Sequence, residues 1–379
     1  MSVVTITRIE WGTLEGARPR VAGANARLDV HGRAVRVPLV RLTDSDGATG
    51  WGWSRARAAH AETLVGAALD TLFDPARGVP EPGLPIEWAL WDLVGQRTGR
   101  PVYALAAQIN GKPCPPTVRA RCYDTSLYMD DLHLSDTDAA AAFIAHEARQ
   151  GWETGHRAFK IKVGRGAWHM DWQAGTARDI AVVKAVRDAV GPTCPLMLDA
   201  NNGYTLNIAK HVLEQTAACH VHWMEEAFHE DAEFYRQLKQ WLADAGLGVL
   251  IADGEGDASP HLLRWAKDGL IDVVQYDIFG EGLTRWLSLG RTLDGWNVGS
   301  APHHYGGHYG NYAACHLSPA IDKFTFAEWD DVLTPGLDAS GYIIKGGFVH
   351  VPDAPGFGLH LDDAVFARAV CENGGTAQK

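Results

Sequence analysis

The sequence predicts an α/β fold, a (β/α) barrel of the TIM type that follows an N-terminal α+β capping domain. From about residue 117, short apolar runs alternate with stretches of helical periodicity, which is typical of βαβ units and a parallel sheet. The chain has 379 residues, enough for a barrel and an attached domain. The expected boundaries are 1–115 for the capping domain, 116–345 for the barrel and 346–379 for a segment that packs back on the capping domain.

The N-terminal part is expected to form strands and then helices. Asp46-Gly47 is a hairpin turn signal between two of the expected strands, which cover residues 3–11, 35–43 and 49–53. Residues 16–32 carry Pro, Gly, Asn and Arg without a period, and we expect a long loop there, a feature that is often functional. Apolar spacing and a Pro at the first turn predict helices over 58–72 and 85–97.

Eight apolar runs are expected to form the barrel strands, and most of them end in ionisable residues. The runs cover residues 118–123, 158–163, 195–199, 221–225, 248–252, 272–276, 296–301 and 324–327. The carboxyl ends of barrel strands meet at one face, where the active sites of this fold lie. The ionisable residues at these ends are therefore expected to share one site.

The composition limits the classes of partner. A net charge of −12 argues against nucleic acid or a membrane surface, which need basic patches, but allows a small carboxylate substrate. Scattered cysteines without a CxxC pair indicate reduced thiols. Neither a signal peptide nor an apolar stretch of membrane-spanning length is visible, so a cytoplasmic location is expected by default.

Three strand-end carboxylates predict a metal site. Asp199 and Glu225 end the third and fourth runs and Glu255 follows shortly after the fifth, and without a partner the three would repel one another. Carboxylate oxygens together with water suit Mg²⁺, which needs no soft ligand. The alternative is three separate salt bridges at helix N-termini.

Lys160 and Lys162 predict a base, because residues two apart on a strand point to the same side. Paired cations beside a metal depress each other's pKa, so a lysine that is neutral near pH 7 could remove a proton. The alternative, two lysines on a solvated edge strand, does not suit a barrel.

Asp277 and His303 follow neighbouring strands and predict a second acid/base group, a carboxylate that fixes the imidazole tautomer. His304 and His308 are close in sequence, so whether they contribute stays open. Glu328 ends the last run and could donate a hydrogen bond to a substrate carboxylate if protonated, or cap a helix. Together these groups suit removal of the proton next to a carboxylate, which leaves an enediolate that a metal stabilises.

The ordered motifs resemble the enolase superfamily, in its mandelate racemase subgroup. They are FKIKVG (159–164), LMLDANNGY (196–204), WMEEA (223–227), DGE (253–255), DVVQYD (272–277) and APH (301–303), with EWALWDLVGQRTGRPVYAL (87–105) ahead of the barrel. The resemblance covers nearly the whole chain and implies the superfamily's chemistry, a Lys or His base with Mg²⁺. Three residues depart from the usual pattern of the family, namely Ala227, Gly256 and Tyr276. The resemblance therefore does not identify the substrate.

The resemblance also implies roles for individual residues. Asp199, Glu225 and Glu255 become the Mg²⁺ ligands, with Asn201 in support. Lys162 becomes one base, assisted by Lys160, and Asp277 with His303 becomes the dyad on the opposite face, while Glu328 matches the carboxyl donor to the substrate. Loops at 16–32 and near 54–60 are expected to close over the substrate, and family members usually form homo-oligomers.

Dehydration of an acid sugar is the favoured activity, and racemisation or epimerisation at the α-carbon is the alternative, because the same residues serve both. Arg18, Arg20, Arg27 and Arg33 favour a polar or acidic substrate. A non-catalytic binding protein is disfavoured because every expected ionisable position is filled. A metal-dependent hydrolase is disfavoured because the first barrel strand carries no HxH pair of histidine ligands.

Overall fold

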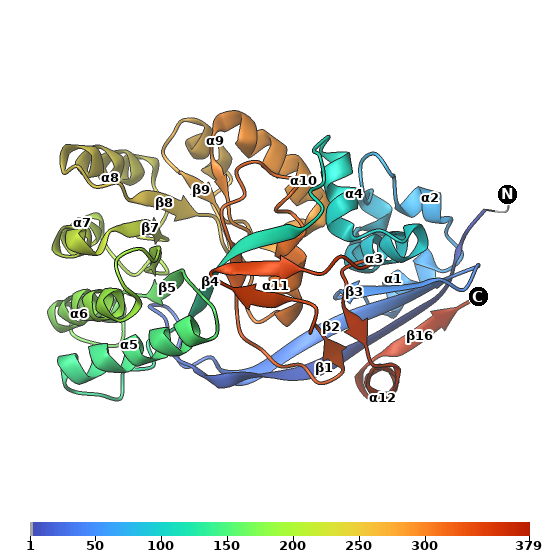
Figure 1. Ribbon diagram of the computed structural model, residues 1–379, viewed down its shortest axis with the longest axis horizontal. Helices are drawn as coiled ribbons and strands as arrows, with labels where there is room; N and C mark the ends of the chain where they lie inside the picture. Colours follow the sequence, from blue (N-terminus) through green and yellow to red (C-terminus); the bar gives the residue numbers. More distant parts are fainter. Residues whose placement is uncertain (1–2) are drawn as a thin grey trace.

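The structure is a computed structural model that describes residues 3–379. Its N-terminal strands form an antiparallel sheet in the order β16-β1-β2-β3. The strands are β1 (Ile6–Ala22), β2 (Gly32–Asp44), β3 (Thr49–Trp53) and β16 (Gly375–Gln378). The β1–β2 ribbon runs from this sheet to the barrel (Figure 1), where Ala17 pairs with Leu333 and Ala24 with Met129.

The prediction of a loop over 16–32 is wrong for its first part. Residues 16–22 continue β1 and pair with β2, for example Gly16 with Val35 and Ala17 with Ala34, so that the loop covers only 23–31. Arg18 lies in this stretch and is buried, where it forms an ion pair with Asp330. Because a charged residue at a buried position interrupts the apolar alternation that marks a strand, the sequence did not indicate a strand here.

The first helical region is also more broken than expected. The predicted helix over 58–72 forms two short helices, α1 (Ala58–Leu64) and α2 (Leu69–Leu72), with Gly66 at a φ of 88° between them. The predicted helix over 85–97 is α3 (Glu87–Thr98), which follows a 3-10 turn at Glu81–Ile86 and ends at Gly99. Helix α4 (Val102–Ile109) was not predicted separately.

The eight apolar runs form parallel strands in chain order. They are β4 (Val118–Leu127), β5 (Phe159–Lys162), β6 (Leu196–Asp199), β7 (Val221–Glu225), β8 (Leu250–Asp253), β9 (Val273–Val274), β10 (Gly299–Ser300) and β11 (Ala327–Trp329). β11 returns to pair with β4, and a bridge from Ser300 to Phe324 joins β10 to the residues before β11. The ring of a (β/α) barrel is thereby completed.

Helices cover the outside of the barrel (Figure 1). They are α5 (Thr137–Glu153), α6 (Trp172–Val190), α7 (Leu206–Gln215), α8 (Ala232–Asp244), α9 (Leu262–Lys267), α10 (Ile278–Trp296) and α11 (His308–Cys315). Asp136, Asp171, Thr205 and Asp231 cap the N-termini of α5 to α8 with side-chain oxygens. Inside the ring, Tyr123, Met197, Trp223 and Phe326 form a separate buried cluster. The interior of the barrel is thus a packed core, so a site for a small molecule is expected at the ends of the strands.

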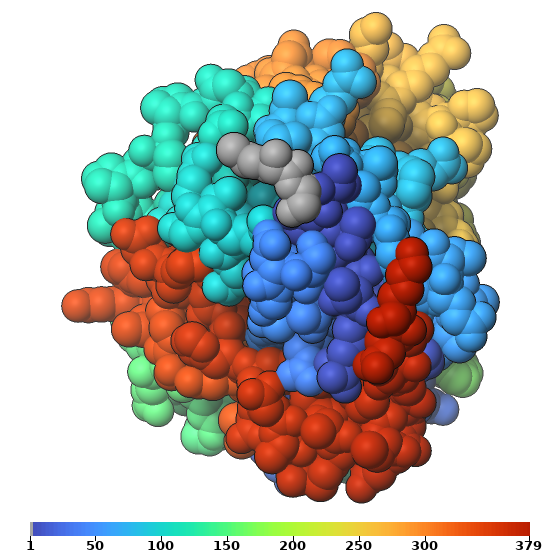
Figure 2. All heavy atoms as spheres, turned by 90° about the vertical axis from the view of Figure 1, so that its right-hand side faces the viewer, coloured from blue at the N-terminus to red at the C-terminus, as the bar shows by residue number. Residues whose placement is uncertain are grey.

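The C-terminal segment contacts both parts of the molecule. β14 (Phe348–Val351) pairs antiparallel with barrel strand β4, and β13 (Ile343–Lys345) pairs with β14. Helix α12 (Asp363–Asn373) packs against β1, and β16 pairs with β1, so the last residues lie beside the first strands (Figure 2). Two short strands, β12 (Leu337–Asp338) and β15 (His360–Leu361), pair with each other. Within residues 3–379 no helix is both long and apolar enough to cross a membrane.

Candidate active site

The register of the parallel strands puts three ionisable residues side by side. Lys162 pairs with Asp199 across β5 and β6, and Asp199 pairs with Glu225 across β6 and β7. Each is the last residue of its strand, and their side chains are at most 8% exposed. The carboxyl ends of three neighbouring strands therefore form a common floor.

Glu255 joins this floor through a turn after β8. Gly254 has a φ of 128° and a Cβ there would lie 3.2 Å from the backbone nitrogen of Gln275, so the turn requires glycine. One carboxylate oxygen from each of Asp199, Glu225 and Glu255 lies within 4.8 Å of the others. The three acids converge on one point at the strand ends, where each also has an ion-pair partner, Lys162 for Asp199, Lys160 for Glu225 and His303 for Glu255. An all-oxygen set of this kind suits Mg²⁺.

Glu225 is held in a fixed orientation. Its Oε2 accepts hydrogen bonds from Trp223 Nε1 at 3.0 Å and from Gln275 Nε2 at 2.9 Å. Oε1 receives the ammonium group of Lys160 at 2.7 Å. These contacts fix the carboxylate before any cation binds, as is usual for groups that surround a metal ligand.

The lysine pair is buried, and the acids around it act on the pKa of both ammonium groups. Burial lowers the pKa of both ammonium groups; Glu225 and Glu328 outweigh this for Lys160, and Asp199 does so for Lys162, so both pKa values are raised. The expected depression assumes a metal ion on these carboxylates and stays a prediction, because the acids that raise both pKa values are the candidate metal ligands and Glu328. A divalent cation on the same carboxylates would reverse the balance.

His303 bridges two acids. Its Nδ1 lies 3.2 Å from Asp277 Oδ2 and its Nε2 lies 3.0 Å from Glu255 Oε2. Asp277 Oδ1 also accepts from the backbone of Phe279 and Gly280, which caps α10 and fixes the carboxylate. Burial lowers the pKa of His303, but Glu255, Glu328 and Asp277 together raise it to about 10. These three acids therefore favour the protonated form of the imidazole.

Glu328 is an ionised partner of Lys160, 2.8 Å from its Nζ. Its Oε1 accepts from Thr125 Oγ1 at 2.7 Å and its Oε2 from the backbone nitrogen of His304 at 3.0 Å. Burial raises the pKa of Glu328, but Lys160 and the nearby histidines hold it below its usual range. These contacts favour the ionised carboxylate, and none of them caps a helix.

The two neighbouring histidines have different positions. His304 is buried, and its Nε2 contacts the backbone oxygen of Glu328 at 2.9 Å, so it supports that residue from behind. His308 lies in α11, where Nδ1 contacts Thr334 Oγ1 and Nε2 contacts the hydroxyl of Tyr312. His308 is therefore part of the packing between α11 and the chain after β11.

Asn201 connects two of the candidate ligands. Its backbone nitrogen donates to Asp199 Oδ1 at 3.0 Å, and its Nδ2 donates to Glu255 Oε1 at 3.1 Å and to Glu226 Oε2 at 2.9 Å. Asn201 and Glu226 both have a positive φ, 41° and 42°, a conformation that costs energy and is often found at functional sites. Glu226 was not singled out from the sequence, although it is the second acid of WMEEA.

A cavity of about 220 Å³ opens above this floor. Its floor includes Lys162, Asn201, Glu255 and His303, while Asn25, Arg27, Leu28 and His31 line it from the loop over 23–31, with Tyr128 and Tyr305 at its side. The loop was expected to lie over the substrate and Arg27 was singled out, but Asn25, Leu28, His31 and the two tyrosines were not predicted as site residues, since nothing local in the sequence marks them. Residues 54–60, which were expected to help close the site, do not line this cavity.

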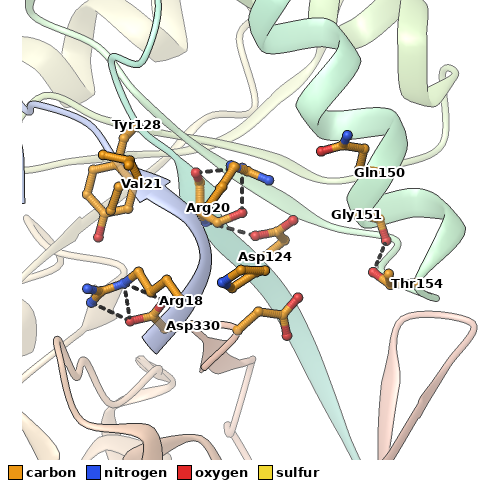
Figure 3. A pocket seen from close by; sticks show the side chains of 13 residues that line it. Arg18, Arg20, Val21, Asp124, Tyr128, Gln150, Gly151, Thr154 and Asp330 are labelled. Carbon is orange, nitrogen blue, oxygen red and sulfur yellow. Dashed lines mark hydrogen bonds and ion pairs between the residues drawn. The ribbon is translucent and has the colours of Figure 1, made fainter. Parts of the chain in front are cut away.

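Most of the arginines singled out near the first loop do not line this cavity. Arg18 is bidentate to Asp330, and Arg20 pairs with Glu147 and donates to Ser126. Both line a larger neighbouring cavity of about 360 Å³ (Figure 3). In the described part of the chain, Arg27 is the one arginine of these four that lines the smaller cavity. Its Nη1 lies 3.7 Å from Glu226 Oε1.

Comparison with known proteins gives consistent matches. Residues 144–365 match the family described as enolase C-terminal domain-like. Arabinonate dehydratase of Saccharolobus solfataricus is 26% identical over 310 residues, which are 78% of this chain and 74% of that protein.

Two solved structures are more similar. Galacturonate dehydratase from Geobacillus sp., complexed with D-galacturonate and 5-keto-4-deoxy-D-galacturonate, is 46% identical with a TM-score of 0.95 over 99% of each chain. A mandelate racemase/muconate lactonizing protein from Geobacillus sp. Y412MC10, complexed with magnesium/tartrate, is also 46% identical, with a TM-score of 0.97 over 100% of this chain and 98% of that chain.

Proposed function

The chain belongs to the enolase C-terminal domain-like family, and from this membership we propose that it is a hydro-lyase that dehydrates an acid sugar with Mg²⁺ as its cofactor. The proposal is supported by 46% identity over nearly the full length to a galacturonate dehydratase. It is also supported by the similarity to arabinonate dehydratase. We propose the same division of the chain as before, with 116–345 carrying the chemistry and 1–115 supplying the loop above it.

One observation carries the proposal. Three carboxylates lie within 4.8 Å of one another, with Lys162 beside them from β5 and His303 beside them from the end of β10. A substrate carboxylate bound between them would have basic groups near two sides of its α-carbon. Few reactions other than α-proton removal need this combination.

In the proposed reaction, Asp199, Glu225 and Glu255 would hold Mg²⁺, which stabilises negative charge on the substrate carboxylate. Lys160, whose side chain is 1% exposed, adds a second positive charge at the same place. Glu328 and Asn201 position these groups through the contacts described above. The preorganised charges favour the enediolate over the bound acid.

Lys162 or His303 removes the α-proton, and the electron pair of the broken C–H bond moves into the carboxylate to give the enediolate. That pair then returns, the bond from the β-carbon to its hydroxyl oxygen breaks, and the hydroxyl leaves as water with a proton from His303. The enol that remains takes up a proton at the β-carbon while its hydroxyl at the α-carbon loses one, which gives a 2-keto-3-deoxy acid. Asp277 stabilises the imidazolium of His303 at the stage when it is protonated.

Racemisation or epimerisation is the second candidate, and the presence of both Lys162 and His303 favours it. A proton taken by one base can return from the other on the opposite face of the α-carbon. The two reactions differ in the fate of the β-hydroxyl, which the same residues leave undetermined.

The test is incubation with Mg²⁺ and a panel of acid sugars in D₂O, followed by proton NMR, with D-galacturonate and D-arabinonate first. We expect loss of the α-proton signal and new signals from a deoxy carbon next to the keto group. Exchange of the α-proton without deoxy signals would replace the dehydratase with a racemase or epimerase. No change on any compound would reject both.

Variants make the test specific to the candidate residues. Lys162→Ala and His303→Asn should each lower turnover by about 100-fold or more, the usual contribution of a general acid or base. Lys184→Ala and His360→Asn change the same residue types at exposed positions and should keep wild-type turnover.

A further inference from the structure

His31 lies in the part of the cavity that carries no assigned chemistry. It belongs to the loop over 23–31 and lines the cavity with Tyr128 and Tyr305. Its ring centroid is 5.2 Å from each tyrosine ring, tilted against Tyr128 and edge-on to Tyr305. These contacts hold the imidazole in place before a substrate arrives, so any group it presents to the cavity is preorganised.

The hydrogen bonds of His31 determine what it presents. Its Nδ1 lies 2.6 Å from the backbone oxygen of Gly23, and because a carbonyl oxygen only accepts, Nδ1 carries the proton. The other nitrogen, Nε2, is then a hydrogen-bond acceptor in the neutral ring. Burial lowers the pKa of His31, and Lys162 contributes in the same direction, which favours the neutral form. No residue of the described chain contacts Nε2 by a hydrogen bond.

Lys162 supplies positive charge at the floor of the cavity, but the arginines near His31 are paired with acids. Arg18 lies against the ring of Tyr305, with its guanidinium carbon 5.2 Å from the ring centre, and its hydrogen bonds go to Asp330 (Figure 3). Arg27, at the rim, is more than half exposed and turned to Glu226. A second carboxylate next to His31 would therefore meet an acceptor nitrogen and aromatic rings, an unfavourable place for an anion.

We propose that His31 is a specificity-determining residue that accepts a hydrogen bond from a hydroxyl at the substrate end remote from the reacting carboxylate, and so selects acid sugars with one carboxylate over the corresponding diacids. The inference rests on the proposed function, because it assumes an acid sugar in this cavity. The cavity of about 220 Å³ lies below the usual range of roughly 300–1,000 Å³ for ligand pockets, which also favours a compact substrate.

The first experiment compares the best monoacid of the screen with the diacid of the same configuration, for example D-galacturonate with galactarate, in the presence of Mg²⁺. We expect kcat/KM to favour the monoacid by about 100-fold or more, since the second carboxylate is desolvated without a partner. His31→Arg supplies a cation, so it should raise kcat/KM for the diacid and narrow this preference by about tenfold or more.

The second experiment isolates the acceptor nitrogen. His31→Phe keeps a ring between the two tyrosines and should raise KM for the monoacid about tenfold with kcat little changed, the result of lost uniform binding. His31→Gln keeps an acceptor oxygen and should recover most of the affinity. His360→Phe, the same change at an exposed histidine, should have no effect. Thermal unfolding of each variant checks that the fold is retained.

Calorimetry can measure the binding of the monoacid and the diacid to the Lys162→Ala variant in the presence of Mg²⁺. This tests the assignment of His31 separately from the proposed activity. Equal affinity for the monoacid and the diacid, or a His31→Phe variant with unchanged KM, would overturn the assignment of His31 and leave the dehydratase intact. If no acid sugar binds or is turned over, the proposed function and this inference both fail.

Discussion

Glu255 shows how a single residue reaches the proposed metal site without strand register. Asp199 and Glu225 are adjacent because β6 and β7 pair there, but Glu255 lies two residues past the end of β8 and depends on the turn at Gly254. Its carboxylate also contacts Asn201 and His303. Glu255 thus links the proposed metal ligands to the proposed acid/base group.

Glu255→Gln should weaken Mg²⁺ binding and turnover together. An amide keeps one oxygen but loses the charge that favours a hard cation, so we expect the Kd for Mg²⁺ to rise by about tenfold or more. Calorimetric titration of the chelator-treated protein with Mg²⁺ measures this directly. Glu214→Gln, at an exposed position, is the control, and an unchanged Kd for Glu255→Gln would remove this residue from the proposed site.

The residues that could be predicted are those fixed by strand periodicity. Lys160, Asp199 and Glu225 occupy strand positions that the apolar pattern already marks, and the structure brings them together. His31 and Tyr128 could not be found this way, because they reach the cavity from a loop and a strand extension through tertiary packing.

At the scale of elements, the first part of the loop over 23–31 is buried against the barrel, while residues 27–30 are exposed. Ala26 is 4% exposed, and it packs where two glycines follow the ends of β5 and β6. A Cβ on Gly203 would lie 2.6 Å from the Cβ of Ala26, and one on Gly164 would lie 2.8 Å from it. His169 Nε2 also contacts the backbone oxygen of Asn25 at 2.7 Å. The missing side chains of the two glycines allow the loop to reach the cavity.

Gly203→Ala should displace this loop while the barrel stays folded. The added methyl group would overlap Ala26, and the exposed loop can yield more easily than the barrel can. We expect kcat/KM to fall about tenfold, with faster trypsin cleavage at Arg27. Gly248→Ala is a matched control, because a Cβ there meets nothing within 4 Å. Unchanged kinetics and proteolysis for Gly203→Ala would show that the seating of Ala26 does not matter.

Long-range pairing explains why the extended β1–β2 ribbon could be predicted only in part. The apolar alternation near the start of β1 identified a strand, but the pairing continues to Ala22 opposite Gly32. In that outer region, Arg18 is buried against Asp330, a residue 312 positions away. A pattern within a short stretch of sequence does not reveal a partner this far away. The charged residues in the outer part of β1 therefore indicated a loop.

At the scale of the whole molecule, His316 joins three regions distant in sequence. It follows α11 and is fully buried. Its Nδ1 accepts from the backbone nitrogen of Tyr103 in α4 at 2.9 Å, and its Nε2 contacts the hydroxyl of Tyr342 at 2.7 Å. That hydroxyl donates to the backbone oxygen of Phe357 at 2.5 Å. One imidazole thus connects the N-terminal helices, the barrel and the C-terminal segment.

This connection requires a neutral ring. A proton on Nδ1 would point at the amide of Tyr103, and burial lowers the pKa of His316 to about 3. The unfolded chain, with the ordinary value of 6.5, binds a proton between these pH values and the folded chain does not. The contribution of His316 to stability is therefore complete above about pH 6.5 and is lost as the pH falls toward 3.

His316→Gln should remove this pH dependence while keeping the contacts, because the amide oxygen can accept from Tyr103 and the amide nitrogen can donate to Tyr342. Between pH 6.5 and 4.5 the slope of the unfolding free energy against pH should become smaller by about 1.4 kcal/mol per pH unit. Urea denaturation at a series of pH values measures the slope. His308, whose pKa burial lowers to about 4, titrates in both proteins, so the difference isolates His316. His360→Gln should keep the wild-type slope, and a His316→Gln slope equal to wild type would mean that the three regions are held together without this histidine.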